Sequence, residues 1–303
     1  MSGEDMSLPD LLKGAVDTHV HAGPAYIRRR DDALTMARRA EAAGMRALVL
    51  KDHHTTTSTL AAQVDRELSD IRVIGSVVMN ASIGGINPSA AETSIAVGAR
   101  VVWLPTVSAR AHKEAITTRG VRFPSADRAP TRPVEDLVCV TDERGRLLPE
   151  VWDLLDVIAA NHDVVLATGH VDADEVTAIV AAARCRNVDR IIVTHPDYIV
   201  GASLDQMAAW VRAGAMCEIA GSTTWTRSSL ACIPSDRTTE VIRRVGASSL
   251  ILSSDFGQRD NPPHLEALQH WIEELIATGV SRHEVQTMLV DNPGQLLSIE
   301  RLP

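Results

Sequence analysis

Apolar, β-branched runs alternate along the chain with stretches in which apolar residues recur at helical spacing. The runs have the length of buried strands. Eight of them occur, over residues 15–21, 46–51, 72–79, 100–105, 163–168, 189–194, 215–219 and 249–253. Amphipathic segments between them include residues 32–43, 58–68, 88–98, 149–160, 172–184 and 237–245. The pattern predicts strands and helices in alternation.

Capping residues mark several of these boundaries. Asp31 and Ser58 stand before two predicted helices, as N-caps do. Gly44 and Gly98 follow two helix ends and lead directly into the next strand. Two closing helices are predicted over residues 265–278 and 282–289, and the segment Asn292-Pro-Gly-Gln-Leu-Leu297 ends the domain.

Eight strands that alternate with helices predict a parallel sheet, because parallel neighbours need a crossover between them. A (β/α)8 TIM barrel and an open doubly wound sheet both fit this order. The first strand is followed by His21-Ala-Gly23-Pro24 and not by a GxGxxG turn, which disfavours the open sheet. We therefore expect an α/β fold, a TIM barrel formed as a single domain by residues 1–303.

One connection is longer than a barrel needs. Residues 106–148, after the fourth strand, form an insertion in which 137–140 and 146–148 flank Asp142-Glu-Arg-Gly145, the pattern of a hairpin. An insertion after a barrel strand lies on the C-terminal face, where active sites of this fold are found. The insertion could be a lid, a decorative excursion or an oligomer contact.

Composition excludes several classes of protein. No apolar run reaches the roughly 20 residues of a membrane span, and the first residues lack the basic and apolar regions of a signal peptide. The net charge of −9 disfavours a nucleic-acid partner. Four cysteines form no CxxC pair and resemble reduced thiols. We expect a cytoplasmic homo-oligomer that acts on a small-molecule substrate and binds neither nucleic acid nor membrane.

Residues of the kinds that bind metals stand where predicted strands end. His19 and His21 are two apart on the first strand, so their side chains point to the same face. His170 and His195 follow the fifth and sixth strands, and Asp255 follows the eighth. Each residue alone could be a solvated loop residue or a helix cap. Because the ends of barrel strands converge on one rim, the five together predict a site for zinc or a similar ion.

The same residues carry a resemblance to a known family. Asp17-x-His19-x-His21, a histidine after each of strands five and six, an aspartate after strand eight and the closing Asn292-Pro-x-x-Leu-Leu297 resemble the amidohydrolase superfamily. Within it the chain is most similar to a branch grouped only as a domain of unknown function. The features that carry this likeness are Leu50-Lys-x-His53, Gly84-Gly-x-Asn-Pro88, Ala167-Thr-Gly-His170, Val193-Thr-His-Pro196 and Leu252-Ser-Ser-Asp255. The resemblance implies a metal-dependent hydrolase barrel.

Lys51 departs from the family pattern. Binuclear members bridge two metals with a carboxylated lysine or a glutamate after strand four, where this chain has Trp103-Leu-Pro-Thr-Val-Ser108. Lys51 instead ends strand two and is one of only three lysines, with Lys13 and Lys113. A carboxylated Lys51 would allow two Zn²⁺ ions, with Mn²⁺ or another divalent metal as alternatives. An unmodified ammonium would leave one metal and offer a cation to the substrate, and a lysine that reaches solvent would do neither.

The predicted mechanism uses a water activated by metal at His19, His21, His170, His195, Lys51 and Asp255. Asp255 would take the proton of that water and deliver it to the leaving group, while Lys51 or His53 polarises the scissile carbonyl. The expected reaction is hydrolysis of a C–N or C–O bond in a small amide, lactam, lactone or ester.

The predicted substrate contacts are more dispersed than the metal ligands. An anionic substrate could be attracted by Arg110 or by the run Arg28-Arg29-Arg30, which could equally be a solvated loop. Aromatic stacking would come from Trp103, Trp225, Phe256 or Tyr198. The remaining substrate-binding candidates are Asn80, Asn87 and Glu218.

Two other functions stay open at this point. A mononuclear decarboxylase of a small unsaturated or aromatic acid would use the same histidines and aspartate. A non-catalytic metal-binding protein would have no need of the proton-transfer residue Asp255.

Overall fold

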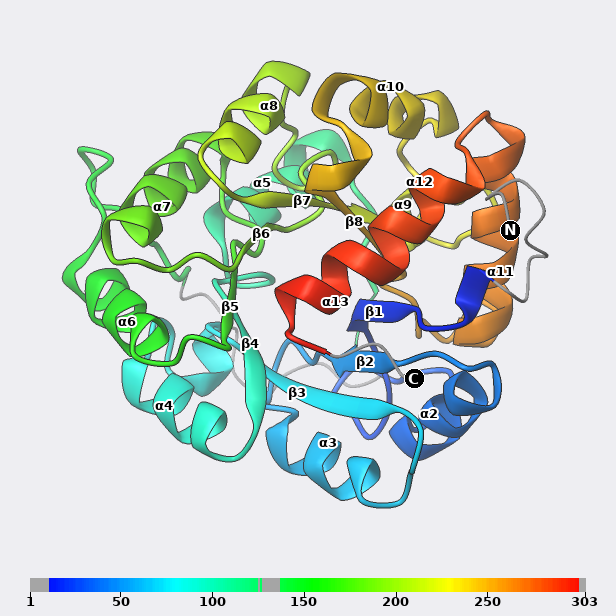
Figure 1. Cartoon of the computed structure of the whole chain (residues 1–303). Helices are drawn as coiled ribbons and strands as arrows, with labels where there is room; N and C mark the ends of the chain where they lie inside the picture. The colour runs from blue at the N-terminus through cyan, green and yellow to red at the C-terminus, as the bar shows by residue number, and fades with distance from the viewer. Residues whose placement is uncertain (1–10, 125, 127–136, 300–303) are drawn as a thin grey trace.

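The computed structural model describes residues 11–124, 126 and 137–299 and places eight parallel strands in chain order, each paired with the next (Figure 1). Backbone contacts near the strand ends join the first strand to the last: His21 N donates to Phe256 O over 2.8 Å, and Asp255 N donates to His19 O over 2.8 Å. The strands are β1 Val16–Val20, β2 Ala47–Leu50, β3 Arg72–Val78, β4 Ala99–Trp103, β5 Val165–Ala167, β6 Ile191–Val193, β7 Met216–Ala220 and β8 Leu250–Ser253. The predicted (β/α)8 barrel is confirmed.

Helices surround the strands (Figure 1). They are α2 Ala33–Ala42, α3 Ser58–Asp65, α4 Pro88–Ala96, α5 Arg110–Arg119, α6 Pro149–Ala159, α7 Ala173–Cys185, α8 Leu204–Arg212, α9 Gly221–Thr224, α10 Ser235–Val245, α11 His264–Ala277, α12 Arg282–Gln286 and α13 Asn292–Leu296, with short helices η1 Ala81–Ile83, η2 Ala247–Ser249 and η3 Thr287–Asp291. In the described part of the chain, no helix combines the length and apolar character needed to cross a bilayer.

The strands are buried on both faces, which explains why they read as continuous apolar runs. Inside the barrel, alternate strand residues such as Val49, Val165 and Ile251 form one core cluster. Their neighbours face outward and pack under the helices in a larger cluster. On α2 the buried residues are Ala33, Met36, Ala37 and Ala40, the spacing of a single helical face.

Two predicted caps are wrong by one residue. Asp32, not Asp31, caps α2, because its carboxylate accepts a hydrogen bond from Thr35 N over 2.8 Å; Asp31 pairs with Arg39 instead. Ser58 is the first residue of α3, and Thr57 occupies the capping position. Thr57 Oγ1 donates to Leu50 O over 2.7 Å, so this hydroxyl joins α3 to the end of β2.

The end of the barrel where strands begin is closed by the C-terminal helix. Leu296 and Leu297 of this segment pack against Val16 and Ala47 at the starts of β1 and β2, and α13 lies across this end in Figure 1. Asn292 Nδ2 donates to the carbonyls of Ala247 and Leu250, at 2.8 and 2.7 Å. The predicted helix over 282–289 is divided, because α12 ends at Gln286 and the chain continues without a break through the π-helix η3 into α13.

The insertion after β4 contains α5, which the sequence reading did not predict. Ala111 and Ala115 of this helix pack against Tyr198 and Ile199, which follow β6, so α5 covers part of the C-terminal face. The expected hairpin is reduced to one antiparallel bridge, between Thr141 and Leu147. Residues 125 and 127–136 of the insertion lie outside the described residues.

Candidate metal centre and active site

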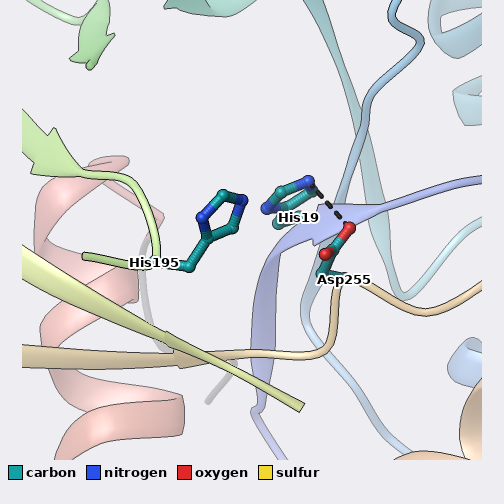
Figure 2. Close-up of side chains that lie close together, drawn as sticks. All are labelled: His19, His195 and Asp255. Atoms are coloured by element: carbon teal, nitrogen blue, oxygen red, sulfur yellow. Dashed lines mark ion pairs between the residues drawn. The ribbon is translucent and has the colours of Figure 1, made fainter. Parts of the chain in front are cut away.

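The carboxyl ends of three strands bring together three buried ligand-type side chains. His19 lies in β1, His195 follows β6 and Asp255 follows β8, and one ligand atom from each lies within 4.8 Å of the others (Figure 2). His21, Lys51, His53 and His170 line the same cavity as His195 and Asp255.

The hydrogen bonding of His21 leaves a lone pair directed at a carboxylate. Nδ1 lies 2.8 Å from the carbonyl oxygen of Lys51, which can only accept, so this nitrogen carries the proton. Burial, together with repulsion from Arg29, lowers the pKa of His21 to about 3, and the ring is neutral at pH 7. Nε2 therefore presents its lone pair to Asp255 Oδ1 at 2.9 Å. Two electron pairs at this distance repel unless a cation lies beside them.

His19 directs its Nε2 at the same carboxylate oxygen. Its Nδ1 lies 3.0 Å from Glu218 Oε1, while Nε2 lies 3.1 Å from Asp255 Oδ1. Burial alone would raise the pKa of Glu218, but its interaction with His19 outweighs burial and lowers the pKa to about 2, so this carboxylate is ionised. Burial also opposes a proton on His19, yet Asp255 and Glu218 raise the pKa of its ring. The site thus favours positive charge at His19 Nε2.

These residues fit a divalent metal. Among the described residues, His170 Nε2 and His195 Nδ1 are buried ring nitrogens of the cavity without a hydrogen-bond partner. Burial lowers the pKa of His195 to about 4 and the pKa of His170 well below its usual value, so both rings are neutral. Neutral imidazoles beside an ionised carboxylate are the donor set that zinc takes in proteins. Metals bound this way commonly rest on histidines oriented by a carboxylate, as Glu218 orients His19.

Asp255 is held in place by backbone geometry and one hydroxyl. Its φ of 48° lies in the left-handed region, which aspartate tolerates better than most residues. Ser222 Oγ donates to Oδ2 over 2.6 Å, leaving Oδ1 to the histidines. The contacts with His19 and His21 overcome the effect of burial and keep the pKa of Asp255 well below its usual value. Two positions on, Gly257 packs so tightly that a Cβ would lie 1.7 Å from His21 O.

Asp17 braces the strand ends without facing the cavity. Its Oδ1 accepts from the backbone of His19 and Ser254, at 3.2 and 2.9 Å, and its Oδ2 lies 2.9 Å from His264 Nε2 of α11. The first residue of the Asp-x-His-x-His motif therefore fixes β1 against β8.

Lys51 does not reach solvent, so that alternative is wrong. It is 1% exposed, and Nζ lies 3.0 Å from His19 Nε2 and 4.1 Å above the ring of Trp103. Trp103 itself ends β4 and has no exposed surface, and its ring centroid lies 4.7 Å from that of His19 with the two planes tilted by 50°. The indole thus fills the place from which strand four would supply a bridging ligand. Burial, partly offset by Asp255 and Glu218, lowers the pKa of Lys51 to about 8.

The cavity beside these groups is narrow, with a volume of about 10 Å³, roughly the space that one water molecule needs. Its wall includes Tyr198, Leu230 and Gln258, and the insertion contributes Phe123 and Pro124. The site is therefore a small pocket that combines polar groups with apolar and aromatic walls.

Two residues of the insertion were missed by the sequence reading. His112 of α5 places Nδ1 2.8 Å from His170 Nδ1, which directs His170 Nε2 away from α5. Phe123 makes edge contacts with the rings of His53, His112 and His170, with centroids 5.3, 4.6 and 6.3 Å apart. The available signal was a histidine and one of only two phenylalanines inside an insertion expected at this face.

Several predicted substrate contacts do not line the cavity. Asn80 uses its amide to hold His53 O and Thr106, and Asn87 caps α4 through Ala90 N. Arg110 is half-exposed and pairs with Asp172 and Glu175. The geometry corrects these three roles to structural ones, because each polar group already has a protein partner.

The other predicted substrate contacts also lie outside the cavity, with one exception. Glu218 and Trp103 lie behind His19, and Trp225 and Phe256 are buried together outside the cavity wall. Of the proposed aromatic residues, Tyr198 alone lines the cavity.

The fold is shared with solved structures of low sequence identity. A candidate 2-pyrone-4,6-dicarboxylic acid hydrolase from Pseudomonas putida is 15% identical with a TM-score of 0.57, over 95% of this chain and 98% of that chain. An organophosphorus hydrolase from Deinococcus radiodurans is 14% identical with a TM-score of 0.57, over 96% and 94%. The probable dipeptidase PvdM from Pseudomonas aeruginosa is 12% identical with a TM-score of 0.62, over 96% and 98%.

These structural neighbours are hydrolases of the amidohydrolase superfamily, as the strand-end residues suggested. No curated protein matches the sequence. A model of a family of unknown function, DUF6282, matches residues 14–218, which is more than half of the chain, and the chain belongs to that family.

Proposed function

We propose that this protein is a metal-dependent hydrolase that cleaves a C–N or C–O bond of a small amide, lactam, lactone or ester. The observation that carries the proposal is the convergence of the Nε2 atoms of His19 and His21 on one carboxylate oxygen, Asp255 Oδ1, in a buried site. His19, His21, His195 and Asp255 would hold the ion, with His170 as a further ligand. Zinc is the metal that this donor set favours.

A divalent metal held by these residues would lower the pKa of a water and polarise a carbonyl oxygen. Asp255 would accept a proton from the attacking water, because its Oδ1 faces the histidines and Ser222 donates a hydrogen bond to its Oδ2. The Lys51 ammonium, buried above Trp103, would stabilise negative charge that develops on the substrate oxygen. Phe123 and Tyr198 would exclude water from the bound substrate.

Two further observations support this assignment. The structural neighbours are named as hydrolases of a pyrone dicarboxylic acid, of organophosphorus compounds and of dipeptides, chemistries that share attack by water. The wall of the cavity combines apolar and aromatic side chains with a few polar groups, as small-molecule sites do.

Decarboxylation of a small unsaturated acid is a second candidate. Trp103 stands at the end of β4, where a bridging lysine would be needed, and Lys51 Nζ lies over its ring as a cation would. Both features favour a single metal, the state that the decarboxylase alternative uses. Carbon dioxide release from acids, measured beside ester and lactone hydrolysis, separates the two reactions.

The test combines metal analysis with turnover. Protein loaded with zinc should bind one equivalent and hydrolyse members of a panel of small esters, lactones and amides. Asp255→Asn should lower turnover by about 10²–10⁴-fold while the fold persists. Asp31→Asn, a carboxylate outside the site, is the matched control and should keep full activity. Absence of bound zinc, or full activity of Asp255→Asn, would overturn the proposal.

A further inference from the structure

We propose that Arg29 is the anchor for a carboxylate group of the substrate, so that the hydrolase acts on small anionic molecules. This inference rests on the proposed function and adds the substrate class to it. It starts from a cation that lines the metal-site cavity and has no partner in the described protein.

Arg29 is 8% exposed and lines the cavity together with His21, Lys51 and Asp255. Its Nε and Nη2 are both buried, and neither has a hydrogen-bond partner among the described residues. The side chain nevertheless starts from a fixed backbone. Arg29 forms an antiparallel bridge with Gln258, and Arg30 N donates to Gly257 O over 3.0 Å. The loop after β1 is thus tied to the loop after β8, directly beside Asp255.

A buried guanidinium without partners is costly, because burial removes its water and nothing replaces it. Burial lowers the pKa of Arg29, and the nearest carboxylates, Asp52 and Asp255, offset this only in part. No described carboxylate lies within 4.0 Å of Arg29. Asp255 is turned to the histidines, and Asp52 Oδ1 accepts from His54 N and Thr55 N. A ligand group is therefore the remaining candidate for the pairing.

Other arginines of the chain show what a structural role looks like. Arg237 pairs with Asp197 at 2.9 Å and donates to Ala202 O, and Arg110 pairs with Asp172 at 2.9 Å. Both lie outside the cavity and their guanidinium groups are occupied. Arg29 differs from them in burial, in its free nitrogens and in its position.

The geometry favours a carboxylate over a phosphate. Two adjacent guanidinium N–H groups match the two oxygens of a carboxylate, one negative charge for one positive. A phosphate dianion would need a second cation, and the other buried cation of the cavity, Lys51, already lies between His19 and Trp103. Arg29 and the candidate metal ligands line the same cavity. One small molecule could therefore present a carboxylate to Arg29 and its reacting group to the metal ligands.

Three hydroxamates of one chain length provide the test. Succinic acid monohydroxamate carries a carboxylate at the end remote from the metal-binding group, its monoamide analogue is neutral there, and 3-phosphonopropionohydroxamate carries a phosphonate. Dissociation constants are measured by calorimetry on zinc-loaded protein. We expect the carboxylate compound to bind the wild type at least about tenfold more tightly than the amide, as charge-assisted hydrogen bonds allow.

Arg29→Gln should abolish that preference, and Arg29→Lys should retain part of it because a charge remains without the planar fork. Arg28→Gln is the matched control, since it removes the same charge from the neighbouring exposed residue and should keep the preference. Equal affinities in the wild type, or an unchanged preference in Arg29→Gln, would overturn the inference. An Arg29-dependent preference for the phosphonate would also overturn it. Zinc content of the same samples separates the two proposals: missing zinc refutes the hydrolase, whereas full zinc without carboxylate preference refutes only the role of Arg29.

Discussion

Polar side chains at the two ends of the barrel have different partners. At the end closed by α13, Arg100 Nη2 donates to Leu297 O over 2.9 Å, and Arg190 donates to Leu296 O and Ser298. At the open end, Arg29, His170 and His195 keep buried nitrogens without a partner in the described residues. At the closed end, backbone carbonyls of the chain itself accept the hydrogen bonds of the arginines. At the open end, the buried nitrogens are left for a metal or ligand that the chain does not supply. Around the cavity at the open end, such nitrogens from three residues therefore gather at one place.

The largest expected effect compares a glycine at each end. Gly257→Ala would put a Cβ 1.7 Å from His21 O, against rigid backbone, and should destabilise the fold by at least about 4 kcal/mol. Gly98→Ala has a similar φ, +107° against +125°, but meets nothing within 4 Å and should cost about 1–3 kcal/mol from backbone strain alone. Urea denaturation of both variants measures the difference. An equal loss of stability in the two variants would mean that the backbone at the open end can move to accept a Cβ, contrary to the expectation.

Lys51 makes the stability of the metal-free protein depend on pH. Its pKa is about 8 in the folded state against 10.5 in the unfolded chain, because burial disfavours the ammonium. Between these values the unfolded chain binds more protons, so stability should rise with pH from about 8 to 10.5. The full difference corresponds to roughly 3 kcal/mol. Denaturant midpoints across this range, compared between wild type and Lys51→Met, measure it; a parallel pH dependence in both proteins would contradict the assignment.

A change of Glu218 tests whether metal affinity at the open end depends on the carboxylate that orients His19. Glu218→Gln keeps the shape but weakens the acceptor for His19 Nδ1. The affinity for zinc should fall by about 10–100-fold, the usual effect of removing the group that orients a metal-binding histidine. Competition with a chelator of known affinity measures the loss. Ser253→Ala, which removes a different hydrogen bond to Glu218, should have a smaller effect.

The smallest effects compare two arginines. Arg100→Met removes donors to Leu297 O and Asp163 O and should destabilise the protein by about 1 kcal/mol. Arg29→Met removes a buried cation without partners and should leave stability unchanged or raise it by about 1 kcal/mol. Thermal unfolding of both metal-free variants gives the signs. If both substitutions lowered the stability, the proposed difference between the two ends would be contradicted.

Periodicity predicted all eight strands because parallel strands buried on both faces leave a continuous apolar run. Strand ends then predicted His19, His21, His170, His195 and Asp255, since the barrel closes and brings its carboxyl ends to one rim. Glu218 was predicted to contact the substrate but contacts His19 instead. The pattern of β7 could not decide this, because an inward side chain can point either to a cavity or to a neighbouring histidine.

Contacts made by irregular segments could not be predicted in this way. The run Arg28-Arg29-Arg30 was a candidate for an anionic substrate, but in a loop no period indicates which of the three side chains points inward. His112 and Phe123 belong to the insertion, in which the sequence predicted no helix. Asn80 and Asn87 were misassigned for a related reason: asparagine serves equally well as a backbone cap and as a ligand contact. Their hydrogen bonds become visible only when the loops are folded.

The insertion after β4 has a consequence for how members of such a family can diverge. The ligands of the candidate metal centre come from the barrel strands, whereas Phe123 and Pro124 come from a segment outside the βα repeat. The candidate metal ligands and one part of the pocket wall are thus encoded in separate stretches of sequence. Exchanging residues 106–148 between relatives would redraw the wall of the pocket and leave His19, His21, His195 and Asp255 untouched.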